Sequence, residues 1–182
     1  NLSLGGGGYG QTLNDAVAAA RAAGLIIVAS AGNESLSTPT YPAAYEGVVS
    51  VSATTASLRL AGYSNYGSTI DISAPGNSVL STAAELVNGF VDPIYASSSG
   101  TSMAAPHVAG TIALMKAVYP DMSPEAFDSV LISGNITQDL GTPGRDNRFG
   151  FGLIDAFKAL DYAQQLNAGL PIPVTPLLNI SS

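Results

Sequence analysis

Residues 100–110 of the sequence read GTSMAAPHVAG and hold the two side chains with the clearest capacity for chemistry. Ser102 follows a glycine–threonine pair, and His107 is the only histidine of the chain. A serine hydroxyl becomes a nucleophile when a general base lies within about 2.6–3.2 Å of it. The segment therefore raises two questions: whether Ser102 is a nucleophile, and whether His107 activates it.

The segment that starts at Ser102 is predicted to be a helix, and this geometry separates the two side chains. Residues five positions apart on a helix are rotated by about 140° and displaced by about 7.5 Å along the axis. Lys116, the next candidate base, would lie about 20 Å away on the same helix. We therefore expect neither His107 nor Lys116 to activate Ser102.

Ser102 is predicted to lie where the glycine turn SSSGT passes into this helix. The first backbone N–H groups of a helix have no intrahelical partner and can stabilise a developing negative charge. Pro106 is expected within the first turn, where its missing N–H costs nothing. A GTS triplet by itself more often marks only a helix cap, so the functional interpretation depends on the rest of the chain.

The elements that must position this serine alternate along the chain. The apolar run at residues 25–30 predicts a strand buried on both faces of a sheet, and three further runs predict strands. The periodic segments predict helices, one of them capped by Ser123 before Pro124. The expected strands cover residues 25–30, 47–55, 70–76 and 94–100, and the expected helices cover residues 12–23 with Thr12 as N-cap, 101–119, the segment from 123, and 153–166. This order predicts an α/β fold of three layers, α/β/α, with a mostly parallel sheet and a site at the carboxyl ends of its strands.

Composition sets limits on the partners of the chain. Of its 182 residues 46% are hydrophobic and 10% are charged, which is enough to bury the core of one domain. The net charge of −7, with only six Lys and Arg, gives no basic surface for nucleic acid. No apolar run reaches the ~18 residues of a membrane span, so no membrane partner is expected. The absence of cysteine excludes disulfides and thiolate metal sites.

The segment SSSGTSMAAPHVAG resembles the nucleophile signature of the subtilisin-like serine proteases. Five other segments are similar to the same family in its order: NLSLGG, ASAGNES, YPAAYEGVVSVSA, YSNYGSTIDISAPG and FGFGLIDAFKAL. The resemblance implies that residues 1–166 are the C-terminal portion of a peptidase domain, and residues 167–182 are expected to be a proline-rich linker or strap. It also implies that His107 is a packed structural residue.

The resemblance assigns chemistry to three residues. Ser102 would be the nucleophile of a serine endopeptidase, Asn33 and the Ser102 N–H would bind the oxyanion, and Thr101 would support them. An amide at the end of a buried strand can donate to an oxyanion, an effect whose standard measured example is itself a subtilisin. Asn33 could instead be a turn residue or a glycosylation acceptor, since NES fits N-x-S/T, as do the motifs at Asn135 and Asn179.

The resemblance also implies the walls of a pocket for peptide or protein substrates. The two walls are SLGG and SAG, and Thr40 is expected at the base of the pocket; the wall residues are Ser3, Leu4, Gly5, Gly6, Ser30, Ala31 and Gly32. No cofactor is expected for the chemistry. A structural calcium or sodium ion is expected on the carbonyls of Ala43, Tyr45 and Val48 with the carboxylate of Asp71, although Asp71 could simply cap a turn.

The triad order of subtilisins along the chain is Asp, His and Ser. The acid and the base are therefore expected upstream of Asn1, and this chain alone is expected to be inactive. The surface left by the missing part is expected to promote self-association, and the parent protein is expected to be extracellular. A non-catalytic, pseudoprotease-like binding or scaffolding module is the alternative. An esterase of the α/β-hydrolase type is disfavoured because no G-x-S-x-G motif surrounds Ser102.

Overall fold

The computed structural model describes residues 1–171. The predicted linker at residues 167–182 therefore lies almost entirely outside the described residues, and only its first residues close the last helix. The elements follow in the order α1 (Gln11–Ala22), β1 (Ile27–Ser30), β2 (Val48–Thr54), β3 (Ile72–Pro75), β4 (Val79–Val87), β5 (Phe90–Ser98), α2 (Thr101–Val118), α3 (Pro124–Ile132), β6 (Thr137–Gln138), β7 (Leu153–Ile154) and α4 (Ala156–Asn167).

A five-stranded sheet with the order β1-β2-β3-β7-β6 forms the centre of the molecule. The first four strands of this order are parallel, and β6 pairs antiparallel with β7. Strand β2 is buried along all seven of its residues, as expected for a strand covered on both faces. The predicted mostly parallel sheet is confirmed.

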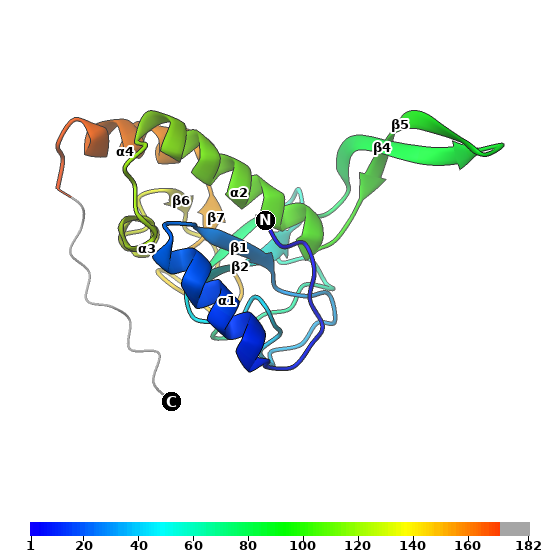
Figure 1. Ribbon diagram of the computed structural model, residues 1–182, viewed down its shortest axis with the longest axis horizontal. Coiled ribbons are helices and arrows are strands. Elements are labelled where there is room, and N and C mark those ends of the chain that lie inside the picture. Colours follow the sequence, from blue (N-terminus) through cyan, green and yellow to red (C-terminus); the bar gives the residue numbers. More distant parts are fainter. Residues whose placement is uncertain (172–182) are drawn as a thin grey trace.

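Helices α1 and α2 lie on opposite sides of this sheet (Figure 1), and a separate hydrophobic cluster lies under each. Alternate side chains of a strand point to opposite faces: Val28 joins the large cluster under α2, α3 and α4, whereas Ala29 joins the smaller cluster that contains Val17 of α1. The predicted α/β/α arrangement is therefore confirmed. No helix within residues 1–171 combines the length and the hydrophobicity needed to cross a membrane.

Two helices begin at positions other than the predicted ones. Helix α1 begins at Gln11 with Gly10 as its N-cap, so the prediction of Thr12 as the cap is wrong. The hydroxyl of Tyr45 accepts a hydrogen bond from the Gly10 N–H and donates one to its carbonyl, both at 3.0 Å, and this fixes the start of the helix. The predicted helix over residues 153–166 begins at Ala156, because Leu153 and Ile154 are recruited as strand β7.

The strand predicted over residues 94–100 is confirmed for residues 94–98, but it lies outside the five-stranded sheet. Most of this segment belongs to β5, which pairs antiparallel with β4 in a separate two-stranded sheet. Asn88 and Gly89 connect the two strands with positive φ values of 52° and 81°, as a two-residue type I′ turn requires. The Asn-Gly pair between apolar runs is the sequence signal for this hairpin, which projects away from the body of the molecule (Figure 1).

Two phenylalanines offer a matched test of the core. Phe127 of α3 is fully buried, whereas Phe157 of α4 is 84% exposed. We predict that Phe127→Ala lowers the free energy of unfolding by about 3–5 kcal/mol, because it removes buried apolar surface and leaves a cavity. Phe157→Ala should change it by less than about 0.5 kcal/mol. Urea unfolding followed by circular dichroism measures both, and equal losses would contradict the assigned core.

Candidate active site

Ser102 is the second residue of α2, whose N-terminus lies beside the ends of β1 and β3. The Gly100 N–H donates to the Gly76 carbonyl at 2.8 Å, and the Gly76 N–H donates to the carbonyl of Thr54 at 3.0 Å. A Cβ on Gly76 would lie 2.6 Å from the Ala53 Cβ and 2.8 Å from the Gly100 carbonyl oxygen. Only glycine allows so close an approach, so Gly76 brings the serine to the edge of the sheet where ligands bind in α/β folds.

Asn33 follows the carboxyl end of β1 and faces the start of α2. Its Oδ1 accepts hydrogen bonds from the Thr101 N–H at 2.8 Å and from the Thr101 hydroxyl at 3.0 Å. The Thr101 hydroxyl itself accepts from the Gly32 N–H at 3.1 Å. Because a backbone N–H can only donate, these bonds fix the orientation of the amide. The Asn33 Nδ2 is therefore the donor end of this amide, and both ends of the amide lie close to Gly100.

Asn65 organises the loop after β1, a role that the sequence did not reveal. It is 3% exposed, and its Oδ1 accepts from the N–H groups of Glu34 and Leu36, both at 3.0 Å. Its Nδ2 donates to the Ala31 carbonyl at 3.0 Å and to the Thr40 hydroxyl at 3.1 Å. A buried asparagine with this many partners fixes the backbone around Asn33. The one available sequence signal was the asparagine of the segment SNYG, which by its type alone fits an ordinary turn.

Gly32 is required by this arrangement. Its φ is +107°, a conformation that side chains rarely adopt, and a Cβ there would lie 2.2 Å from the Asn65 Nδ2. The Glu34 carboxylate lies beside the same loop and accepts from the Asn33 N–H at 2.8 Å and from the Asn65 Nδ2 at 3.0 Å. The segment SAGN is thus held by several independent hydrogen bonds.

Ser3 and Ser102 are joined by two hydrogen bonds. The Ser3 hydroxyl donates to the Ser102 carbonyl at 2.8 Å, and the Ser102 hydroxyl donates to the Ser3 carbonyl at 3.4 Å. Pro106 was expected in the first turn of α2, but it lies further inside the helix, so this prediction is wrong. Because proline has no N–H, the Ser102 carbonyl lacks its usual donor from residue i+4, which explains the first bond. The Ser3 hydroxyl supplies the donor instead.

The two predicted walls lie side by side. The Leu2 N–H donates to the Val28 carbonyl at 2.8 Å, the Ser30 N–H donates to the Leu2 carbonyl at 3.2 Å, and the Ser30 hydroxyl donates to the Leu4 carbonyl at 3.4 Å. Residues 3–6 therefore continue beside residues 30–32. A Cβ on Gly5 would lie 3.7 Å from the Thr40 Cγ2 and 3.9 Å from the Ser30 carbonyl oxygen. Gly5 thus lies between Ser30, which belongs to the wall of residues 30–32, and Thr40.

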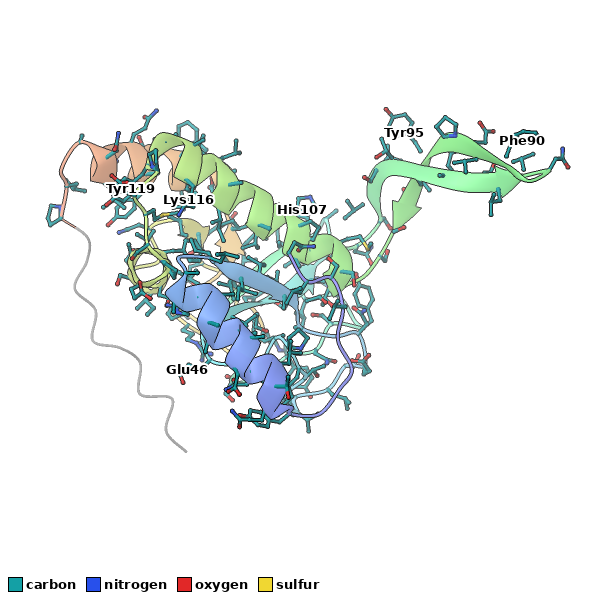
Figure 2. All side chains as sticks on the ribbon, viewed as in Figure 1. Glu46, Phe90, Tyr95, His107, Lys116 and Tyr119 are labelled. Atoms are coloured by element: carbon teal, nitrogen blue, oxygen red, sulfur yellow. The ribbon has the colours of Figure 1, made fainter. Side chains whose placement is uncertain are left out.

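The candidate bases on α2 lie away from Ser102, as the helical spacing predicted. His107 is exposed, and its Nδ1 lies 2.8 Å from the Met103 carbonyl oxygen (Figure 2). The packed role expected for His107 is therefore wrong for this chain. Lys116 donates to the Met122 carbonyl at 2.8 Å. Within residues 1–171, no His, Lys or carboxylate side chain forms a hydrogen bond with the Ser102 hydroxyl.

Asp71 is partly buried and lies next to the segment expected to bind a cation. Its Oδ2 accepts from the Ser50 N–H at 2.8 Å. Burial raises the pKa of Asp71 to about 7, while the Ser50 N–H and the Arg145 guanidinium oppose the shift. Within residues 1–171 no three His, Cys, Asp or Glu side chains cluster as metal ligands. A cation at this place would rely on one carboxylate together with backbone carbonyls, a set of hard oxygen ligands that suits calcium or sodium.

The link between Ser3 and Pro106 can be tested by a double-mutant cycle. We predict that Ser3→Ala costs about 1 kcal/mol of unfolding free energy, because the Ser102 carbonyl loses its donor. In the Pro106→Ala background the cost should fall toward zero, since an alanine at this position supplies the missing backbone N–H. Urea unfolding of the four proteins gives the coupling energy. Equal costs of Ser3→Ala in both backgrounds would show that Pro106 does not create the need for Ser3.

The family model described as the Subtilase family matches residues 1–152. The chain is 40% identical over 155 residues to the minor extracellular protease Epr of Bacillus subtilis, covering 85% of this chain and 23% of that protein. It is 39% identical over 156 residues to subtilisin BL of Lederbergia lenta, covering 86% of this chain and 54% of that protein.

A solved protease of Pseudoalteromonas arctica superposes with a TM-score of 0.80 at 38% identity, covering 90% of this chain and 50% of that one. The chain thus spans from about a quarter to about half of the length of these relatives. The match over residues 1–152 includes the nucleophile segment, the Asn33 loop and both walls. On the strength of that match and this geometry, the chain belongs to the subtilase family.

Proposed function

We propose that the parent protein is a serine endopeptidase in which Ser102 is the nucleophile. The observation that carries the proposal is the pair of hydrogen bonds from Thr101 to the Asn33 Oδ1, because they join Asn33 to the residue before Ser102 and leave its Nδ2 as a donor. In the reaction, the Ser102 Oγ bonds to the carbonyl carbon of the scissile peptide. The carbonyl oxygen becomes an oxyanion, which accepts hydrogen bonds from the Asn33 Nδ2 and the Ser102 N–H.

The proposal requires a base that residues 1–171 do not place at Ser102. We propose that a histidine upstream of Asn1 takes the Ser102 proton and later gives it to the leaving amine, while an upstream aspartate orients that histidine. This chain covers 54% of subtilisin BL and 50% of the Pseudoalteromonas arctica protease, and the proposed histidine and aspartate would correspond to the part of such relatives that it does not cover. The chain of 182 residues alone would then hydrolyse peptides poorly or not at all.

Substrate binding is proposed to use the two walls. An extended peptide would lie with its backbone against residues 3–6 and 30–32, and its side chain before the scissile bond would enter between them. Thr40 limits the depth of that space, because it lies close to Gly5 and is held by the Asn65 Nδ2. Small or medium apolar side chains suit such a site better than long charged ones.

Two further features belong to this proposal. The names of two relatives describe extracellular proteases, which supports secretion of the parent protein. A groove of about 380 Å³ is lined by residues of the N-terminus, the start of β1 and α2, which are Asn1, Gly24, Leu25, Ile26, Val28, Ala109, Ile112, Ala113 and Lys116. Its mostly apolar lining supports packing of a further polypeptide segment there, or self-association of the isolated chain.

A non-catalytic binding module is the second candidate. The absence of a base at Ser102 within residues 1–171 favours it, because an unactivated serine leaves only the peptide-binding walls. The two functions differ in what the intact protein does to an electrophile. An endopeptidase reacts rapidly at Ser102, whereas a binding module does not.

The intact protein provides the test of the catalytic proposal. With the upstream coding sequence included, a fluorophosphonate probe should label the protein, and Ser102→Ala should abolish both labelling and peptide hydrolysis. Asn33→Ala should lower kcat by about 10²–10³, because one oxyanion donor is lost. Asn135→Ala, at another N-x-S/T motif, is the matched control and should leave kcat unchanged. An unlabelled intact protein would favour the binding module.

A second test addresses the cation. We propose that calcium or sodium binds the carbonyls of Ala43, Tyr45 and Val48 with the Asp71 carboxylate and acts on stability rather than on chemistry. Calcium at millimolar concentration should raise Tm by a few degrees, and Asp71→Asn should remove that increase. Asp139→Asn, at an exposed position, should keep it. An unchanged response of Asp71→Asn would contradict the site.

A further inference from the structure

The β4–β5 hairpin is the least covered part of residues 1–171. Its two strands pair only with each other, and it projects away from the body (Figure 1). The large side chains on it are strongly exposed: Phe90 is 78% exposed and Tyr95 is 75% exposed, and both point away from the molecule (Figure 2). A two-stranded sheet has two open edges, and such edges pair readily with other strands.

The register shows which backbone groups face each edge. Val87 and Phe90 flank the two-residue turn and therefore form a hydrogen-bonded pair, and the pairs alternate from there. Ala84 and Pro93 form a non-hydrogen-bonded pair, in which the backbone N–H and C=O groups point away from the partner strand. The proline fits this assignment, because it has no N–H to donate within the hairpin.

The two outer edges consequently differ. On β5, Pro93 interrupts the row of outward donors, a common means of protecting an edge strand. On β4 the row is continuous, because Leu80, Thr82, Ala84 and Leu86 each present an N–H and a C=O outward. None of these N–H groups is hydrogen-bonded to another element of residues 1–171. The outer edge of β4 is therefore continuous, while that of β5 is interrupted in its middle by Pro93.

The side chains of β4 suit pairing with a second copy of the same strand. Leu80 is 67% exposed and Leu86 is 77% exposed, and both lie on the face that carries no charged residue. In an antiparallel pair with Ala83 opposite Ala83, Leu80 lies opposite Leu86 and Thr82 opposite Ala84, so that all four outward residues are hydrogen-bonded. Glu85 then lies opposite Ser81, which keeps the two Glu85 carboxylates apart.

We propose that two copies of this chain associate through their β4 edges, antiparallel about a two-fold axis at Ala83. The product is a four-stranded sheet with the order β5-β4-β4-β5. Both of its outer edges are β5 strands interrupted by Pro93, so the association stops at a dimer. A strand pair of this length is a small interface, and the dimer is expected to be weak, with a Kd on the order of micromolar. This surface is separate from the groove at the N-terminus and does not depend on the proposed function.

A single cysteine tests the register, since the natural chain has none. Across the two-fold axis Ala83 forms a non-hydrogen-bonded pair with Cα atoms about 4.5 Å apart, within the range of a disulfide. Ala83→Cys in the 182-residue chain should therefore give a disulfide-linked dimer on mild oxidation, seen on a non-reducing gel. Ser81→Cys is the matched control: its two copies would lie about 13 Å apart, too far to link.

A charge exchange tests the same pairing without a covalent bond. Thr82→Lys with Ala84→Lys should make the chain monomeric by sedimentation at about 100 μM, and so should Thr82→Glu with Ala84→Glu, because like charges then lie opposite each other. Mixing the two variants should restore a 1:1 dimer. A monomeric natural chain would overturn the proposal, and so would linkage of Ser81→Cys as readily as Ala83→Cys. Dimers that persist in both charged variants would also overturn it, because they would show association through another surface.

Discussion

The contact between Asn33 and Thr101 is the constraint on which the site depends. One amide oxygen receives both donors of Thr101, and this joins the end of β1 to the first turn of α2. The same bonds determine where the amide N–H groups point, because an amide whose oxygen is held can turn only its nitrogen elsewhere. The position of the first turn of α2 and the orientation of the Asn33 amide are therefore two results of a single interaction.

Small residues allow this contact to form. Gly76 lets the start of α2 approach the sheet within the reach of backbone hydrogen bonds, and Gly32 turns the chain beside Asn65 in a conformation closed to other residues. Buried polar groups then hold the loop, with Asn65 using both ends of its amide. Such a fixed amide suits the proposed oxyanion role of Asn33, since an oxyanion donor must be in place before the charge develops.

The β4–β5 hairpin differs from the rest of the chain in how little of it is covered by other elements. The five-stranded sheet is covered by helices, whereas β4 and β5 are exposed on both faces. The outer edge of β5 is interrupted by a proline, and the outer edge of β4 is continuous. The open edge of β4, close in sequence to Ser102, is the surface proposed to pair with a second copy, and it is separate from the groove at the N-terminus. Charge on the chain, −7 overall, opposes non-specific association and favours a pairing that separates its carboxylates.

By itself the sequence determined the α/β order of elements, the placement of Ser102 at a helix start, and the separation of His107 from it, because apolar periodicity and helical spacing are local properties. It did not determine where residues 94–100 pair, how Ser3 compensates for Pro106, or that Asn65 holds the Asn33 loop. Those results join residues far apart in the sequence, such as Ser3 and Ser102. Only the tertiary structure decided them, because the hydrogen-bond partner of a buried or terminal polar group is set by whichever segment packs against it.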